Sequence, residues 1–327
     1  MQNLDSVVEC YYRPGQEESQ SFAGRYDFLS AEATAQVPRE RWKEIQAEQD
    51  PAYRTNSVAQ LGTKRTNNRT FARVSLTVTD VWKERECKRV RTHTWVQEPK
   101  GWRRQFLPVN SEHVSAAMAS GDYTATAELA EEWLEQDPFS IAAYKKLLFA
   151  ISRGGAGDGS RRSRDDILRA VLAINENDST ALFLSASFAS NLSVGKAFLN
   201  QLSRDDCTWH SAARNVAHDH RDLKGRLQFI DSLGSLNTTL VALKLVTLSE
   251  LRRHKEFLSL HAEYGVDQLT TDYLDSEDPS FAAANAALLG LGCQQAGDTG
   301  SALRWLNYAV RKDPNNRTVI QLAKELE

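Results

Sequence analysis

The sequence lacks any run of about 18 apolar residues, the length that a helix needs to cross a bilayer. We therefore expect no membrane-spanning helix. Residues 1–6 also lack a basic stretch followed by an apolar core, so no secretory leader is expected.

Cysteines are few and scattered. The chain has four of them, without a CxxC pair or any short spacing, which argues against a zinc knuckle or a disulfide framework. Cys10, Cys87, Cys207 and Cys293 are therefore predicted to be free thiols, and the protein is expected in a reducing bacterial cytoplasm.

The composition is that of an ordinary globular protein, with 41% hydrophobic and 25% charged residues. A length of 327 residues favours two domains. Residues 1–108 hold 18 Lys+Arg and 14 Asp+Glu, out of 40 and 43 in the chain. The net charge is thus positive in residues 1–108 and negative in residues 109–327, which supports a domain boundary there.

Residues 1–108 combine helical and strand periodicity. Residues 22–35 place apolar side chains at helical spacing, and Pro38 predicts the start of a second helix that ends at Pro51. Alternating polarity and a Pro-Lys-Gly turn predict three antiparallel strands, at residues 70–82, 87–97 and 102–107. The expected arrangement is α+β, with helices first and a curved sheet after them.

Residues 4–108 resemble the nuclear-transport-factor-2-like superfamily, whose fold is a cystatin-like cone. The stretches that resemble it are Val-Val-Glu-Cys-Tyr-Tyr at 7–12, Tyr-Asp-Phe-Leu-Ser-Ala-Glu-Ala at 26–33 and Thr-Trp-Val-Gln-Glu-Pro-Lys-Gly-Trp-Arg at 94–103. The basic, Asn-rich segment 64–69 departs from the family pattern. The resemblance implies a cone that can enclose a pocket and that can pair with a second copy through its sheet face.

Some members of that superfamily are isomerases or dehydratases, in which a base inside the cone works with acidic or phenolic donors. Tyr26, Asp27, Asp80 and His93 are the residues that could take these roles. None lies in a motif specific enough to assign a role, so we expect no enzyme activity and no cofactor. A ligand-binding or enzymatic cone, with the helical part as a targeting arm, stays as the alternative.

Residues 109–327 are helical throughout, and a signature repeats in them. An acidic residue, often followed by proline, precedes an alanine-containing helix at four places, namely 137–144, 177–183, 278–284 and 313–319. Pro279 and Pro314 are 35 residues apart, which is close to the spacing of two-helix tetratricopeptide repeats.

The last repeat unit resembles the tetratricopeptide family most closely. Gly297-Asp298 stands 17 residues before Pro314, as Gly121-Asp122 stands 17 residues before Pro138. Small and large residues alternate as the family places them, at Leu289, Gly290, Ala302, Leu306 and Ala309. Residues 190–275 keep only the helical period, and residues 153–164 are expected to form a loop. We expect an all-α superhelix of tetratricopeptide-like repeats over 109–327.

The resemblance implies a concave groove that binds a peptide or helix of a protein partner. Tyr144, Lys145, Asn285 and Gln294 are the groove residues predicted from the recurring positions. The expected function is that of a non-enzymatic scaffold or adaptor, with the N-terminal domain as a second docking or dimerisation module.

A basic cluster interleaved with tryptophans marks the predicted strands, at Lys83, Arg85, Lys88, Arg89, Arg91, Lys100, Arg103 and Arg104. It favours a charged solvent face, or else a docking surface for the acidic helical part or for a partner. Nucleic-acid binding is the least favoured reading, because Glu84, Glu86 and Glu98 dilute the charge. Arg89, Arg91 and Arg103 are the predicted partner-binding residues here.

Two other motifs are weak. The glycine-rich stretch 154–160 is not followed by Lys-Ser or Lys-Thr, so an inter-helix loop is favoured over a phosphate loop. His210, His218 and His220, with Asp219 and Asp222, could supply metal ligands but offer no compelling set. An exposed polar stretch is expected there, and no metal site.

Overall fold

The computed structural model describes residues 3–12, 25–49, 54–66, 68–82, 85–155, 162–220, 222–276 and 279–327. The N-terminal part holds short helices and four strands, in the order α1 (Leu4–Tyr12), η1 (Tyr26–Phe28), α3 (Ala31–Gln36), α4 (Arg39–Gln49), β1 (Arg54–Thr66), β2 (Arg69–Trp82), β3 (Arg85–Glu98) and β4 (Gly101–Arg104).

A long all-helical part follows. Its helices are α5 (Pro108–Ala119), α6 (Tyr123–Gln136), α7 (Ile141–Ser152), α8 (Arg164–Ile174), α9 (Ser179–Ser187), α10 (Leu192–Gln201), α11 (Trp209–His218), α12 (Leu223–Ser232), α13 (Thr238–Glu250), α14 (His254–Asp272), α15 (Pro279–Gln295), α16 (Thr299–Lys312) and α17 (Arg317–Leu326), with the 3-10 helix η2 (Leu274–Ser276) before α15. The predicted order of an α+β part followed by a helical part is confirmed. Within the described residues, none of these helices has the length and apolarity needed to cross a membrane.

The chain forms two compact units, Met1–Trp209 and His210–Glu327. The first contains the sheet together with α5 to α10. The sheet ends at Arg104 and α5 begins at Pro108, where the domain boundary was predicted, and the first unit extends beyond it to Trp209.

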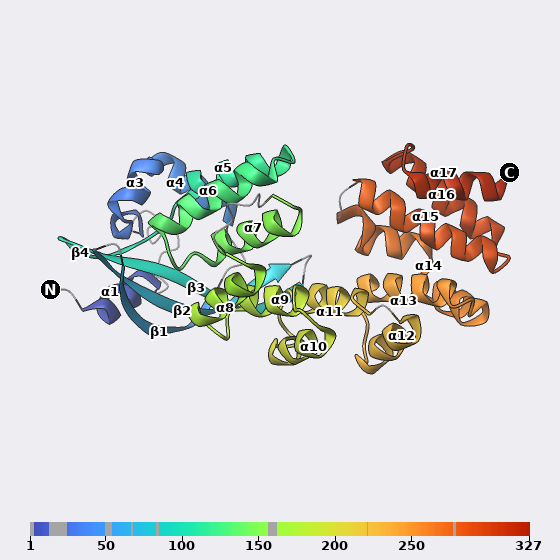
Figure 1. Ribbon diagram of the computed structural model, residues 1–327, viewed down its shortest axis with the longest axis horizontal. Helices are drawn as coiled ribbons and strands as arrows, with labels where there is room; N and C mark the ends of the chain where they lie inside the picture. Colours follow the sequence, from blue (N-terminus) through green and yellow to red (C-terminus); the bar gives the residue numbers. More distant parts are fainter. Residues whose placement is uncertain are drawn as a thin grey trace. The chain divides into compact units, whose positions relative to one another are not determined.

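The four strands form an antiparallel meander in the order β1-β2-β3-β4. One face of the sheet is covered by α1, which lies at the N-terminal end of the first unit in Figure 1. The alternate residues of β2 that point to this face, Ala72, Val74, Leu76 and Val78, are fully buried, as period-2 patterning requires. The predicted strands at 70–82 and 87–97 are confirmed as β2 and β3, while the third is shorter than 102–107 because α5 starts at Pro108.

Strand β1 was not predicted from the sequence. It pairs with β2 along one edge and has two register shifts, one of them next to Gly62, whose φ of 119° suits glycine. Val58 and Leu61 stay more than a third exposed. Because β1 is an edge strand that buries little on either face, it shows no alternation of apolar residues.

The single helix predicted over 22–35 is wrong within the described residues, and Phe22 lies outside them. The chain forms η1 and α3 instead, separated by extended backbone at Leu29 and Ser30. The predicted helix is interrupted at Ser30. The Oγ of Ser30 accepts a hydrogen bond from the Ala33 backbone N–H, at 3.1 Å, and so caps a new helix. The helix predicted after Pro38 is confirmed as α4, with Trp42 fully buried.

The repeated Gly-Asp turns have the same local structure in both units. Gly121 and Gly297 have φ values of 78° and 88°, which end the preceding helix in the left-handed region. Asp122 and Asp298 then cap α6 and α16 by accepting a backbone N–H bond. The turns predicted from the repeat spacing are therefore confirmed in structure.

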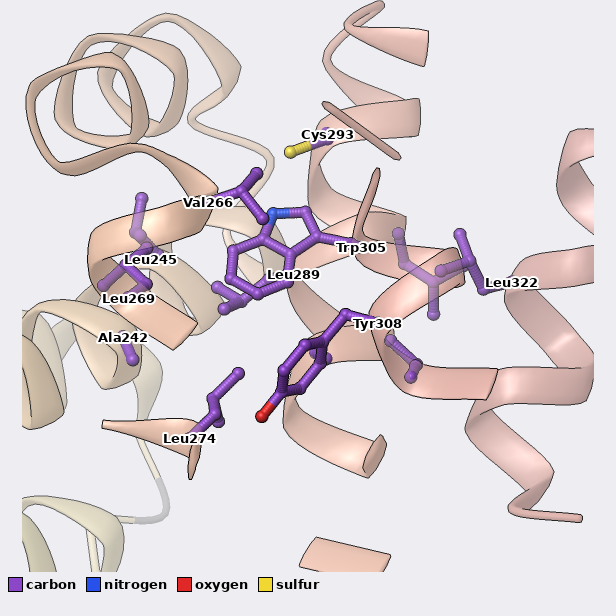
Figure 2. Close-up of a cluster of buried hydrophobic side chains, with 14 of the residues drawn as sticks. Ala242, Leu245, Val266, Leu269, Leu274, Leu289, Cys293, Trp305, Tyr308 and Leu322 are labelled. Atoms are coloured by element: carbon purple, nitrogen blue, oxygen red, sulfur yellow. The ribbon is translucent and has the colours of Figure 1, made fainter. Parts of the chain in front are cut away.

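In the second unit, α15 packs against both α16 and α17 in close contact. A Cβ atom on Gly290 would lie 2.5 Å from Leu322 Cδ2 and 3.0 Å from Trp305 Cβ. Trp305 and Tyr308 fill the space between the helices, as Figure 2 shows. The small residue at 290 thus permits the close approach that the repeat pattern predicted.

Gly290→Ala is expected to destabilise the second unit by about 1–3 kcal/mol, because overpacking exceeds the gain in helix propensity. Gly300→Ala is the matched control. Its Cβ would meet nothing closer than 3.7 Å, so propensity should leave stability unchanged or slightly raised. Urea unfolding monitored by circular dichroism measures both, and equal effects of the two substitutions would contradict the packing argument.

The opposite face of the sheet lies on the turns that join successive hairpins. Strand β3 crosses three of them in the first unit, at residues 136–139, 175–179 and 202–208. Thr94 bonds to the buried Asp137 of the first turn. Thr92 Oγ1 donates to Asp178 Oδ2 of the second turn, at 2.8 Å. The sheet therefore docks on the helical part, but these contacts are made by threonines and not by the side chains of the predicted basic cluster.

An arginine of β2 strengthens this docking. Arg73 Nη1 donates to the carbonyls of Ala173 and Ile174, at 2.7 and 3.1 Å, which satisfies the C-terminal carbonyls of α8. The same guanidinium lies 5.5 Å from the centre of the Phe139 ring. Phe71 packs edge-on against Phe139 at 6.1 Å. Polar and aromatic contacts thus join the sheet to two hairpins at once.

The third turn is tied to β3 by a disulfide between Cys87 and Cys207. The prediction of four free thiols is therefore wrong for this pair, although Cys10 and Cys293 are free. Backbone bonds hold the same place, since Lys88 N–H donates to Asp205 O at 2.9 Å and Cys207 N–H donates to Lys88 O at 3.4 Å. The pairing could not be predicted from the sequence, because 120 residues separate the two cysteines.

Candidate partner-binding surfaces

A shallow groove of about 270 Å³ lies between α13 and α15 of the second unit. It is lined by Val246, Ser249, Glu250, Arg252, Leu288, Leu291 and Gln295. Three of these side chains are aliphatic, and two carry opposite charges at the end of α13. Glu250 also forms a salt bridge with Arg226 at 3.4 Å. The groove thus combines aliphatic side chains of α13 and α15 with polar and charged groups at one end.

The exposed face of α15 continues the groove. Phe281 and Leu288 are seven residues apart, so they share one face of the helix, and they are 40% and 38% exposed. The guanidinium of Arg214, on α11, lies 5.8 Å from the Phe281 ring centre. Asn285 lies between them in sequence, and its Nδ2 donates to Phe281 O at 2.9 Å. The result is an apolar stripe with polar neighbours on a first helix of a repeat.

The other predicted groove residues are placed differently. Tyr144 is buried, and its hydroxyl accepts a bond from Arg162 Nη1 at 2.9 Å, so its ring belongs to the core. Gln294 Nε2 donates to Glu325 O at 3.3 Å, which joins α15 to α17, while its neighbour Gln295 lines the groove. Lys145 is exposed on α7, in the first unit.

The three predicted arginines do not form one cluster. Arg91 lies on the α1 face of the sheet, opposite Leu76, and Arg103 lies on the other face, opposite Val96. Arg103 donates to the carbonyls of Trp102 and Lys100, which stabilises the β3–β4 hairpin. Arg89 lies opposite Val78, on the same face of the sheet as Arg91. The register therefore separates Arg103 from Arg89 and Arg91.

His93 lies inside the first unit, on the sheet face that α1 covers. Its Nδ1 is 2.5 Å from the Tyr12 hydroxyl and its Nε2 is 3.3 Å from Arg104 Nη2. Burial, helped by the charges of Arg104 and Arg91, holds the pKa of His93 well below its ordinary value. A neutral imidazole can act as a base, but both ring nitrogens already have partners within the protein.

The other residues considered for catalysis have structural roles, or their side chains lie outside the described part of the structure. The Tyr26 hydroxyl donates to Val37 O at 2.9 Å. Asp27 forms a surface salt bridge with Arg39. Asp80 lies in β2, and its side chain is outside the described part of the structure. Tyr26 and Asp27 are thus engaged in structural contacts.

His210, His218 and His220 do not converge with Asp222. Asp222 caps α12 by accepting the backbone N–H groups of Lys224 and Gly225. His220 is buried against Phe229, with ring centres 5.4 Å apart, so the expectation of an exposed polar stretch is wrong at this residue.

One group in the described part of the chain brings three possible metal ligands together, namely His261, Cys293 and Asp298. The indole of Trp305 donates to His261 Nε2 at 3.0 Å, and the Cys293 sulfur is 3.7 Å from the same nitrogen. Burial also raises the pKa of Cys293 to about 12, so its sulfur stays a thiol. The lone pair on His261 Nε2 therefore accepts a bond from Trp305, and we assign His261 and Cys293 to the buried core, where Figure 2 shows Cys293 beside Trp305.

Comparison with known proteins leaves the family open. No protein-family model matches the sequence, and no curated protein matches it. Among solved structures, YrrB, described as a TPR protein with an unusual peptide-binding site, is similar with 15% identity and a TM-score of 0.33, over 61% of this chain and 99% of YrrB. The MamA protein is similar with 12% identity and a TM-score of 0.27, over 63% of this chain and 91% of MamA.

Proposed function

We propose that the chain is a non-enzymatic adaptor that binds a protein partner through the groove between α13 and α15. The observation that supports this proposal most directly is the apolar stripe of Phe281 and Leu288 beside the groove. Large side chains left exposed on the first helix of a repeat are typical of surfaces that a partner covers. The sheet is proposed to be a second docking or dimerisation module, with a fold like that of the nuclear-transport-factor-2-like superfamily.

Leu288→Asp is expected to reduce partner binding at least about tenfold, because a carboxylate would be buried without a counter-charge when the partner docks. The measurement is affinity capture with the full chain from a lysate of its own source organism. Leu303→Asp is the matched control, since Leu303 is 47% exposed on α16 and does not line the groove. Equal retention by the two variants would contradict the groove as the binding surface.

A ligand-binding cone is the second candidate function, and the buried polar group of His93, Tyr12 and Arg104 favours it. A carboxylate or carbonyl ligand could replace the hydrogen bonds of this group. If the cone binds such a ligand, the full chain should gain thermal stability in the presence of small carboxylic acids. His93→Gln should remove the gain, and a shift that persists in this variant would place the ligand elsewhere.

A further inference from the structure

The turn that ends α13 has an arginine where three other hairpin turns have glycine. Arg252 has a φ of 56°, in the left-handed region that favours glycine. The turns after α5, α7 and α15 have Gly121, Gly154 and Gly297 there, with φ values of 78°, 81° and 88°. In all four turns this residue donates its backbone N–H to the carbonyl three residues earlier, and the next residue donates to the carbonyl five residues earlier. The four turns therefore have the same backbone structure.

No contact within the unit compensates for this backbone strain. A Cβ atom is disfavoured in the left-handed region, and arginine lacks the short polar side chain that lets asparagine and aspartate tolerate it. Within the described residues, the Arg252 guanidinium takes part in neither a salt bridge nor a hydrogen bond. The adjacent Arg253 is paired, since its Nε and Nη2 donate to the two carboxylate oxygens of Glu256 at 2.6 and 2.5 Å. The side chain at 252 thus strains its turn without stabilising the fold.

Arg252 lines the groove between α13 and α15, at the end where both helices finish. Ser249 Oγ donates to Gln295 Oε1 at 3.5 Å, which brings the C-terminal ends of the two helices together there. The other charged residue of the groove, Glu250, is neutralised by its salt bridge with Arg226. Among the described residues, Arg252 is therefore the charge of the groove without a counter-charge. It gives an otherwise aliphatic groove a cationic end.

We propose that Arg252 selects the partner of this groove by binding an acidic side chain on an amphipathic helix. A guanidinium can donate two parallel hydrogen bonds to one carboxylate. The aliphatic floor and the stripe of Phe281 and Leu288 would receive the apolar face of the same helix. From Phe281 to Gln295 the groove side of α15 extends about 21 Å, at 1.5 Å per residue, which matches about four turns of a partner helix. The inference rests on the proposed adaptor function and adds the charge and form of the partner.

The test is fluorescence anisotropy with the full chain and two labelled, alanine-based helical peptides of about 16 residues, with leucines along one face. One peptide has glutamates beside the leucines, and the other has glutamines at the same positions. The wild-type chain is expected to bind the glutamate peptide at least about tenfold more tightly. Arg252→Gly should bring its affinity down to that of the glutamine peptide, whose own affinity should stay unchanged.

The same variant separates recognition from folding. Because glycine relieves the strain, Arg252→Gly should slow native-state hydrogen exchange in the last turn of α13 at least about twofold. A chain that is locally more stable and yet no longer prefers the acidic peptide has lost recognition alone. Arg253→Gly is the matched control, since Arg253 is already bound to Glu256 and does not line the groove. It should alter the affinity for either peptide less than about twofold.

Three results would overturn the role of Arg252: equal affinity of the wild-type chain for both peptides, a preference for glutamate that persists in Arg252→Gly, or faster exchange at the end of α13 in that variant. Leu288→Asp should weaken the binding of both peptides at least about tenfold. If it does so while the wild-type chain does not discriminate, the groove binds helices and Arg252 has no part in selecting them. If neither peptide binds the wild-type chain, the groove and the role of Arg252 fail together.

Discussion

Replacing Cys87 with serine is expected to lower the free energy of unfolding of the first unit by about 2–5 kcal/mol. The bond joins residues that are 120 apart in sequence, so its loss gives the unfolded chain much more conformational freedom. The rate of native-state hydrogen exchange should increase most in β3 and in the turn at 202–208, because the disulfide holds these two segments together. A reductant should bring the wild-type chain to the stability of the variant.

Cys10→Ser is the control, since Cys10 is an exposed free thiol and its replacement should have no effect. Cys207→Ser should match Cys87→Ser, and the double variant should be no less stable than either single variant. If the reduced wild-type chain is as stable as the oxidised one, the disulfide has no part in holding the sheet on the hairpins.

The stability of the first unit should depend on two buried carboxyl groups at the same interface. Burial raises the pKa of Asp137 and of Asp178 to about 6. The folded state therefore binds these protons more tightly than the unfolded state does. The stabilisation is complete below the unfolded pKa near 4 and is lost as the pH rises through about 6, by about 1–3 kcal/mol for each group.

Asparagine at both positions isolates this effect, because it removes the charge and can still accept the capping hydrogen bonds. We expect Asp137→Asn with Asp178→Asn to be more stable than the wild-type chain at pH 7.5 and to lose that advantage at pH 4.5. Urea unfolding across this range measures the difference. A gap between variant and wild type that does not change with pH would show that the carboxyl groups ionise normally.

The double variant must be compared with the wild-type chain because two histidines also make stability depend on pH. The pKa of His93 is lowered in the folded state mainly by burial, and the pKa of His261 is lowered for the same reason. Each therefore contributes stability above a pH of about 6.5 that is lost as the pH falls. The two effects oppose each other between pH 4 and 7, so the wild-type profile alone cannot separate them.

The helical part could be predicted from sequence where a local interaction left a signature. Gly121-Asp122 and Gly297-Asp298 combine a left-handed glycine with a capping carboxylate, and both functions depend on the residues themselves. Gly290 was identified because close helix packing requires a small side chain. Residues 190–275 lack such signatures, yet they contain α10 to α14, which tertiary packing stabilises instead.

The missed features depend on contacts between distant residues. Strand β1 is held by its pairing with β2, and its own residues bury too little to alternate. The disulfide and the buried Asp178 depend on β3 lying across the hairpin turns, which no spacing in the sequence reveals.

The position of β3 also limits how the first unit can change shape. Thr94 and Thr92 contact successive hairpin turns, and a strand rises about 3.3 Å per residue, so two turns are held about 7 Å apart where the strand crosses them. Helical repeat arrays can ordinarily stretch and bend, because each repeat touches only its neighbours. A strand bonded across several repeats prevents this elasticity. In the second unit the turn at Asp313 bonds to Ser280 rather than to a strand, so elastic adjustment to a partner is expected there.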